Sequence, residues 1–142
     1  GYFLLSRPMT LGVRGLVLDR AANAVFLIRH TYVPGWHLPG GGVERNETFQ
    51  HALERELGEE GNIELTAPPV LASLHFNRQS SPRDHVALFV AEHFRQSAPK
   101  RPDREIAEAG FFPLDGLPGD VTPATARRIE EVTGGKPPSP YW

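Results

Sequence analysis

The chain has 142 residues, with 15 Lys and Arg, 17 Asp and Glu, a formal net charge of −2 and no cysteine. This length suffices for a buried core, so we expect one domain over residues 1–142. Disulfides and thiolate metal sites are excluded, and no apolar run approaches the roughly 20 residues of a membrane span. Without a basic patch, we expect no nucleic-acid polymer as partner. Without an apolar span or a signal-peptide pattern at the start, we expect no membrane partner and a cytoplasmic location. A homodimer is compatible with the sequence.

The chain opens with the pattern of an antiparallel hairpin. Apolar residues alternate from Thr10 to Asp19 and form a second run from Ala24 to His30, with a turn between the two. A loop rich in Gly and Pro is expected from Thr31 to Gly42, and its last three residues are glycines that allow close backbone approach and positive φ. Asn46 is the expected N-cap of a helix that runs to about Gly61.

This helix carries glutamates at a spacing that brings them together. At 3.6 residues per turn, Glu56, Glu59 and Glu60 fall within an arc of about 100°. Anions placed so closely repel one another unless a cation lies among them, and carboxylate oxygens suit Mg²⁺ or Mn²⁺. We therefore expect a divalent metal site, which the oxygens of a diphosphate substrate would complete.

The segment from Gly41 to Ile63 resembles the Nudix box, in which a glycine, a glutamate and an Arg-Glu-aliphatic-x-Glu-Glu run recur at fixed intervals. The matching residues are Gly41, Glu47, Arg55, Glu56, Leu57, Glu59, Glu60 and Ile63. Asn62 replaces the last glycine of the box, and we expect it to take the left-handed conformation that ends many helices. The resemblance implies metal ligation by Glu56, Glu59, Glu60 and the carbonyl of Gly40. Gly41, Glu47 and Arg55 are interpreted as structural.

Three strands and a helix are expected after the box, at 70–76, 85–94, 106–114 and 122–132. Thr122 is the expected N-cap of the helix, with Pro123 in its first position. Residues 134–142 are expected to form a frayed tail. Because the strands include too many hairpins for a doubly wound sheet, the fold class is α/β (α+β), and the resemblance likewise implies an α/β/α sandwich around a mixed sheet.

Four residues outside the box are candidates for substrate binding. Arg29 ends a strand that should point at the box, although a surface arginine is an equal alternative, and Trp36 could stack on a base or pack in the core. Arg78 and Arg83 belong to the polar loop at 77–84, and loops of this kind carry specificity on a rigid scaffold. Glu105 is a candidate for an extra catalytic glutamate, with a solvated loop glutamate as the alternative.

We therefore expect a Mg²⁺-dependent (or Mn²⁺-dependent) Nudix pyrophosphohydrolase with Glu59, Glu56 and Glu105 as catalytic residues. Its small-molecule substrate would be a nucleoside diphosphate linked to another group, and the sequence leaves open a nucleotide sugar such as ADP-ribose or a nucleoside triphosphate. The alternatives are a catalytically weak nucleotide-sensing module, which loss of box carboxylates would favour, and an interaction domain that binds no metal. None of the box carboxylates is lost.

Overall fold

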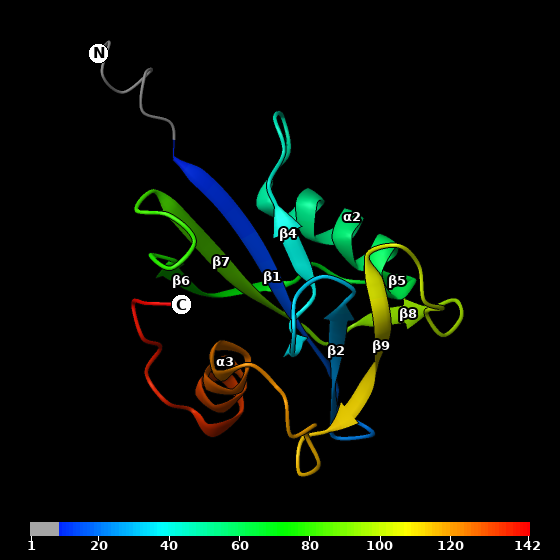
Figure 1. Ribbon diagram of the computed structural model, residues 1–142. Helices are drawn as coiled ribbons and strands as arrows, with labels where there is room; N and C mark the ends of the chain where they lie inside the picture. Colours follow the sequence, from blue (N-terminus) through cyan, green and yellow to red (C-terminus); the bar gives the residue numbers. More distant parts are fainter. Residues whose placement is uncertain (1–8) are drawn as a thin grey trace.

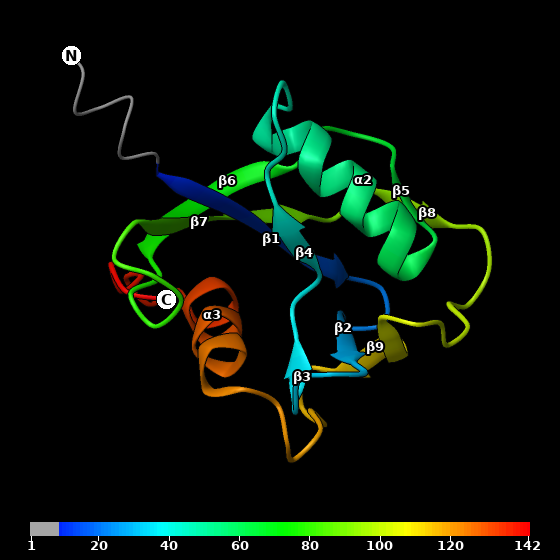
Figure 2. The ribbon, with the colours of Figure 1, turned by 45° about the horizontal axis from the view of Figure 1, so that its top comes forward.

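The computed structural model describes residues 9–142 and consists of a mixed sheet with a helix against each face (Figure 1, Figure 2). The sheet has seven strands in the order β3-β2-β1-β7-β6, with β4 added beside β1 and β9 beside β2, and β5 and β8 form a separate pair. The elements are β1 (Thr10–Asp19), β2 (Ala24–His30), β3 (Trp36–His37), β4 (Gly40–Gly42), α2 (Phe49–Gly61), β5 (Ile63–Leu65), β6 (Val70–Phe76), β7 (Asp84–Ala91), β8 (Phe94–Gln96), β9 (Ile106–Pro113) and α3 (Pro123–Gly134). The expected sandwich fold is confirmed.

The alternation in β1 supplies a core to both faces of the sheet. Val13 and Val17 pack in one cluster with the apolar side of α2. Leu16 and Leu18 point the other way, into a second cluster that includes Ile129 of α3. Because successive side chains of a strand point to opposite faces, this one strand explains why a helix is needed on each side.

The predicted hairpin of β1 and β2 is present, but the two strands pair only near the turn, at Leu18 with Val25 and Asp19 with Ala24. Beyond that point β1 pairs in parallel with β7 and antiparallel with β4. The expectation of a continuous loop up to Gly42 is therefore wrong, because this segment contributes β3 and β4. The glycine strand β4 takes the position beside β1 that β2 leaves.

The box helix α2 begins later than expected. Its N-cap is Thr48, whose hydroxyl accepts a hydrogen bond from the His51 N–H at 3.0 Å, whereas Asn46 has a left-handed backbone with φ of 66°. The other end of the helix is as predicted. Asn62 has φ of 55° and ψ of 34°, and its N–H donates to the carbonyl of Gly58 at 3.2 Å.

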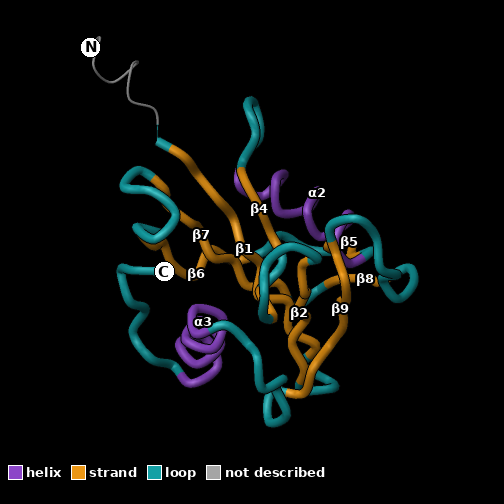
Figure 3. Tube along the Cα trace, viewed as in Figure 1, coloured by secondary structure: helices purple, strands orange, loops and turns teal. Residues whose placement is uncertain are grey.

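The second half of the chain departs from expectation in two places, which Figure 3 shows along the trace. The strand predicted at 85–94 is two strands, since β7 ends at Ala91 and β8 begins at Phe94. The tail predicted to fray is packed instead, because α3 continues to Gly134 and the Trp142 N–H donates to the carbonyl of Phe76 at 3.0 Å. Among residues 9–142, neither α2 nor α3 has the length and the apolar composition of a membrane-spanning helix.

Candidate active site

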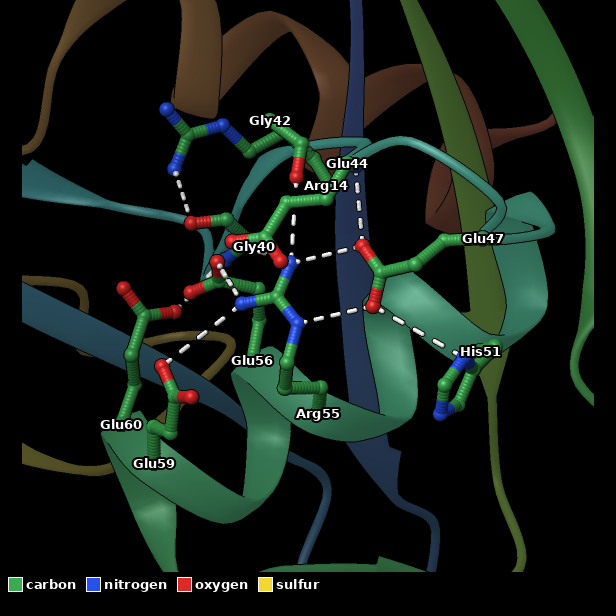
Figure 4. A network of polar contacts seen from close by, with 10 residues as sticks. All are labelled: Arg14, Gly40, Gly42, Glu44, Glu47, His51, Arg55, Glu56, Glu59 and Glu60. Atoms are coloured by element: carbon green, nitrogen blue, oxygen red, sulfur yellow. Dashed lines mark hydrogen bonds and ion pairs between the residues drawn. The ribbon is translucent and has the colours of Figure 1, made fainter.

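The glycine strand β4 lies against the glutamate side of α2 (Figure 4). The N–H of Gly40 donates to Glu60 Oε1 at 2.7 Å. A Cβ atom on Gly41 would lie 2.6 Å from Glu56 Oε1, so only glycine leaves room for that carboxylate. The local sequence thus places two carboxylates of the helix directly beside the main chain of the strand.

Arg55 joins the loop before the helix to the helix itself. Its Nε and Nη2 each lie 2.9 Å from a carboxylate oxygen of Glu47, Nη1 lies 2.9 Å from Glu56 Oε1, and Nη2 donates to the carbonyl of Gly42 at 3.2 Å. Hydrogen bonds from Arg55 hold the pKa of Glu47 down at about 2. Bidentate pairing of this kind fixes orientation as well as charge, which agrees with a structural role for both residues.

The three glutamates of the predicted metal site have different surroundings. The Glu60 side chain is only 7 % exposed, and burial raises its pKa to about 8, with the N–H of Gly40 opposing the shift. Burial also raises the pKa of Glu56, while Arg55 opposes it. The Glu59 side chain is 59 % exposed and lies 3.8 Å from Arg55 Nη1. Burial thus disfavours the ionised forms of Glu56 and Glu60, and a further cation between them would favour those forms.

The donor atoms at this site fit a hard divalent cation in type. They are carboxylate oxygens of α2 and a neighbouring carbonyl, the oxygen ligands that Mg²⁺ and Mn²⁺ take. As arranged here, no group of three His, Cys, Asp or Glu residues within 9–142 is placed to hold a metal ion. The carboxylates of Glu56 and Glu60 are instead bonded to Arg55 and to the N–H of Gly40. Binding a cation would require these side chains to turn toward one another.

A cavity of about 410 Å³ lies next to the glycine strand. Arg14 of β1 connects the two regions, because it lines the cavity and its Nη1 donates to the carbonyls of Leu38 at 3.0 Å and Gly40 at 3.4 Å. Three further segments complete the wall, namely the β6–β7 loop, the start of α3 and the end of the described chain. The lining residues are Arg14, His37, Leu38, Phe76, Asn77, Arg78, Gln79, Thr122, Pro123, Ala124, Thr125, Arg127, Tyr141 and Trp142.

Of the four predicted substrate residues, only Arg78 lines this cavity. Trp36 is 7 % exposed and packs edge-on against Phe112 at 4.7 Å, which favours the core alternative that the sequence left open. Arg29 forms an ion pair with Glu108 of the neighbouring strand, and this carboxylate competes with any phosphate.

Arg83 and Glu105 lie away from the box contacts. Arg83 belongs to the same loop as Arg78 but does not line the cavity, and its N–H donates to Ser81 Oγ at 3.0 Å. Glu105 is exposed, and its N–H donates to Asp103 at 2.9 Å. Within the described chain, no hydrogen bond or ion pair joins the Glu105 side chain to a box glutamate.

Two residues of the site escaped the sequence-based prediction. Arg14 carried a usable signal, because it is a lone charge between Val13 and Gly15 within an apolar strand, and such a charge needs polar partners. Tyr141 carried none, because its place depends on how a distant segment folds back.

Comparison with known proteins agrees with these features. A model of the NUDIX domain matches residues 9–132. A solved MutT NUDIX hydrolase from Burkholderia pseudomallei has a TM-score of 0.74 and 26 % identity, covering 89 % of this chain and 99 % of that one.

Two curated relatives share parts of the sequence. An RNA pyrophosphohydrolase of Gluconobacter oxydans is 41 % identical over 61 residues, 39 % of this chain and 36 % of the relative. The NAD-capped RNA hydrolase NudC of Citrobacter koseri is 32 % identical over 121 residues, 83 % of this chain and 46 % of the relative. The chain thus spans less than half the length of these curated relatives. With the family model matched over most of its length, the chain belongs to the NUDIX domain family.

Proposed function

We propose that this protein is a divalent-metal-dependent hydrolase of the diphosphate bridge in a nucleoside diphosphate linked to a second group. The observation that carries the proposal is a buried carboxylate, Glu60, and a partly buried one, Glu56, held together beside a glycine strand next to a cavity. An ordinary solvated glutamate face would leave both groups exposed and their pKa values unshifted. Glu56 is paired with Arg55, whereas no ion pair to Glu60 occurs within residues 9–142. Burying an acid without a cationic partner is costly, and a bound cation would remove that cost for Glu60.

The proposed metal ligands are Glu56, Glu59 and Glu60 together with the carbonyl of Gly40. A bound Mg²⁺ or Mn²⁺ would neutralise charge on the bridging phosphates and acidify a water. Glu59 is the exposed member, so we assign it to accept the proton of the attacking water. Glu105 remains a second candidate for that role, because it is also an exposed carboxylate.

Arg14 is proposed to bind phosphate oxygens. It lines the cavity and already donates to the carbonyl of Gly40, so its guanidinium lies between the proposed metal site and the cavity. A guanidinium presents several donors in a plane and suits phosphate oxygens. A diphosphate held between the box carboxylates and Arg14 would direct the remainder of the substrate into the cavity.

Two classes of substrate are candidates, a small nucleotide derivative and the 5′ end of RNA. A net charge of −2 and a cavity of about 410 Å³ favour a small nucleotide derivative, either a nucleotide sugar or a nucleoside triphosphate. The names of the curated relatives favour a second candidate, the 5′ end of RNA. Cleavage of ADP-ribose would yield AMP and ribose 5-phosphate, whereas RNA would lose its 5′ phosphates or cap and keep its length.

A substrate panel with product identification tests the proposal. The panel contains ADP-ribose, a UDP-sugar, the common nucleoside triphosphates, and short RNAs with a 5′ triphosphate or an NAD cap. We expect metal-dependent cleavage of a small nucleotide, abolished by EDTA and restored by Mg²⁺ or Mn²⁺. Preferred cleavage of RNA would select the second candidate, and full activity in EDTA would exclude the metal mechanism.

Catalytic loss must be separated from general damage to α2. Glu54 is exposed on the same helix, so Glu54→Gln is the matched control for substitutions of the box glutamates. Calorimetry measures metal binding by the protein without substrate. This measurement distinguishes a domain that binds metal but lacks activity from a domain that binds no metal. A protein that binds Mg²⁺ and nucleotide without turnover would support the sensing alternative.

A further inference from the structure

Residues 139–142 fold back on the end of β6, and two of them, Tyr141 and Trp142, line the cavity. The Phe76 N–H donates to the carbonyl of Pro140 at 2.7 Å, and the Trp142 N–H donates to the carbonyl of Phe76 at 3.0 Å. Tyr141, between these two bonds, forms a parallel bridge with Phe76. Main-chain pairing on both sides therefore fixes where the Tyr141 side chain leaves the backbone.

Arg128 of α3 anchors the same segment from beneath. It is fully buried, forms a bidentate ion pair with Glu131, and donates from Nη1 to the carbonyls of Tyr141 at 3.1 Å and Trp142 at 2.8 Å. The Trp142 ring packs 5.1 Å from the Arg128 guanidinium and 5.3 Å from the His75 ring. A buried charge with this many partners holds its neighbours firmly.

The Tyr141 ring stays accessible although its backbone is anchored. The residue is 45 % exposed and lines the cavity, and the Arg78 guanidinium lies 4.2 Å from the centre of its ring. Arg78 sits on the β6–β7 loop, and its contact with Tyr141 is an arginine stacked on an aromatic face at an exposed position. Such contacts are weaker than the stacking of a nucleobase on an aromatic ring, so a base can displace the guanidinium.

We propose that Tyr141 is a specificity-determining residue whose ring stacks against the nucleobase of the substrate, with Arg78 closing over the opposite face of the base. This inference rests on the proposed function, because it assigns the cavity to the nucleoside part of the substrate. The phosphates would then extend toward Arg14 and the box glutamates. Stacking accepts any base, because every base has a flat face, so Tyr141 selects nucleosides over non-nucleoside phosphates.

Binding without metal tests the assignment independently of hydrolysis. The probes are AMP, GMP, CMP and UMP, each compared with ribose 5-phosphate, which has the sugar and phosphate but no base. Any repulsion between phosphate and the box glutamates affects all probes alike and cancels in the ratio of dissociation constants. We expect at least one nucleotide to bind about tenfold more tightly than ribose 5-phosphate in the wild type.

The variants separate stacking from loss of structure. Tyr141→Ala and Tyr141→Leu should bring the ratio close to one, and the leucine keeps apolar contact with β6 while removing the flat ring. Tyr141→Phe should keep the wild-type ratio. Tyr32→Ala is the control, because Tyr32 is 70 % exposed and does not line the cavity. Thermal unfolding of each variant verifies that it is folded.

The outcomes distinguish this inference from the proposed function. A wild type that shows no preference for any nucleotide, or a folded Tyr141→Leu protein that keeps the preference, overturns the role of Tyr141. If metal-dependent hydrolysis persists in that case, only the stacking assignment is lost. If the base preference depends on Tyr141 but no panel substrate is cleaved, the hydrolase proposal fails and the nucleotide-binding cavity remains.

Discussion

Substituting each of the three glycines of β4 by alanine should give three different results. In Gly40, φ is +144°, and an added Cβ would lie 2.0 Å from the carbonyl oxygen of Val13 and 2.9 Å from the Arg14 Cα. An L residue in such a conformation costs about 1–3 kcal/mol. The overlap is with main chain that cannot move without breaking β1. We therefore expect Gly40→Ala to lower the free energy of unfolding by at least about 3 kcal/mol, out of the roughly 5–15 kcal/mol of a typical domain.

Gly41→Ala should affect catalysis instead of folding. Its Cβ would meet the Glu56 carboxylate, with Oε1 at 2.6 Å and Cδ at 2.9 Å, and this end of a flexible side chain can turn away. The free energy of unfolding should stay within about 1 kcal/mol of the wild type. Displacing one metal-directed carboxylate should lower kcat by about 10²–10³. Gly42 has no atom within 4 Å of an added Cβ, so Gly42→Ala is the control and should change neither quantity.

Thermal and urea unfolding measure the effect on stability, and metal-dependent turnover of the preferred substrate measures the effect on catalysis. Gly40→Ala should unfold at a Tm lower by about 10 °C, whereas Gly41→Ala should unfold near the wild-type temperature. The reasoning is refuted if Gly41→Ala turns over at the wild-type rate, because Glu56 would then not need its present position. Equal destabilisation by all three substitutions would refute the distinction between main-chain and side-chain overlap.

Three further predictions concern α2 and the loop before it. Glu60→Gln should lower kcat by about 10²–10³ with little change in Tm, since burial already favours the neutral form, and near-normal turnover would remove Glu60 from the metal ligands. Asn62→Val should cost roughly 1–2 kcal/mol in urea unfolding because of the left-handed backbone, whereas Asn62→Gly should be nearly neutral, and equal effects would contradict this. The pKa of Glu47 falls from 4.5 to about 2 on folding, so its contribution to stability is complete above pH 4.5 and is lost as pH falls toward 2. In Glu47→Gln, the free energy of unfolding measured with urea should fall less steeply as the pH decreases over this range. An unchanged slope against pH would exclude the ion pair with Arg55 as the source of the loss.

The box region was predictable because its residues act locally. Asn62 occupies a helix end where few residues tolerate a left-handed backbone, and the structure has that backbone. The sequence determines the start of α2 less clearly, because Asn46 and Thr48 both belong to residue types that are favoured as N-caps. The ion pair between Glu47 and Arg55 links the loop to the helix, and Thr48 is the residue whose hydroxyl reaches the free N–H of His51.

The features that the sequence left open or predicted wrongly depend on contacts between distant parts of the chain. Trp36 could stack or pack according to its sequence, and its burial depends on Phe112, far along the chain. The tail at 134–142 contains proline and polar residues that favour disorder. What orders it is Arg128, a residue that on a helix would ordinarily be assigned to the solvent face. Arg14 is intermediate: its lone charge in an apolar strand indicates that it needs polar partners, but the sequence does not show that these are the carbonyls of Leu38 and Gly40.

The cavity wall is divided between segments that differ in how freely they can change over evolution. The Arg14 side of the wall belongs to β1, which supplies the core on both faces of the sheet, so substitutions there affect the whole molecule. Much of the remaining wall consists of a surface loop, the start of α3 and residues 141–142. Loops tolerate insertions and exchanges that strands do not. A lineage could therefore acquire new substrates by altering these three segments independently while inheriting its hydrolytic machinery unchanged.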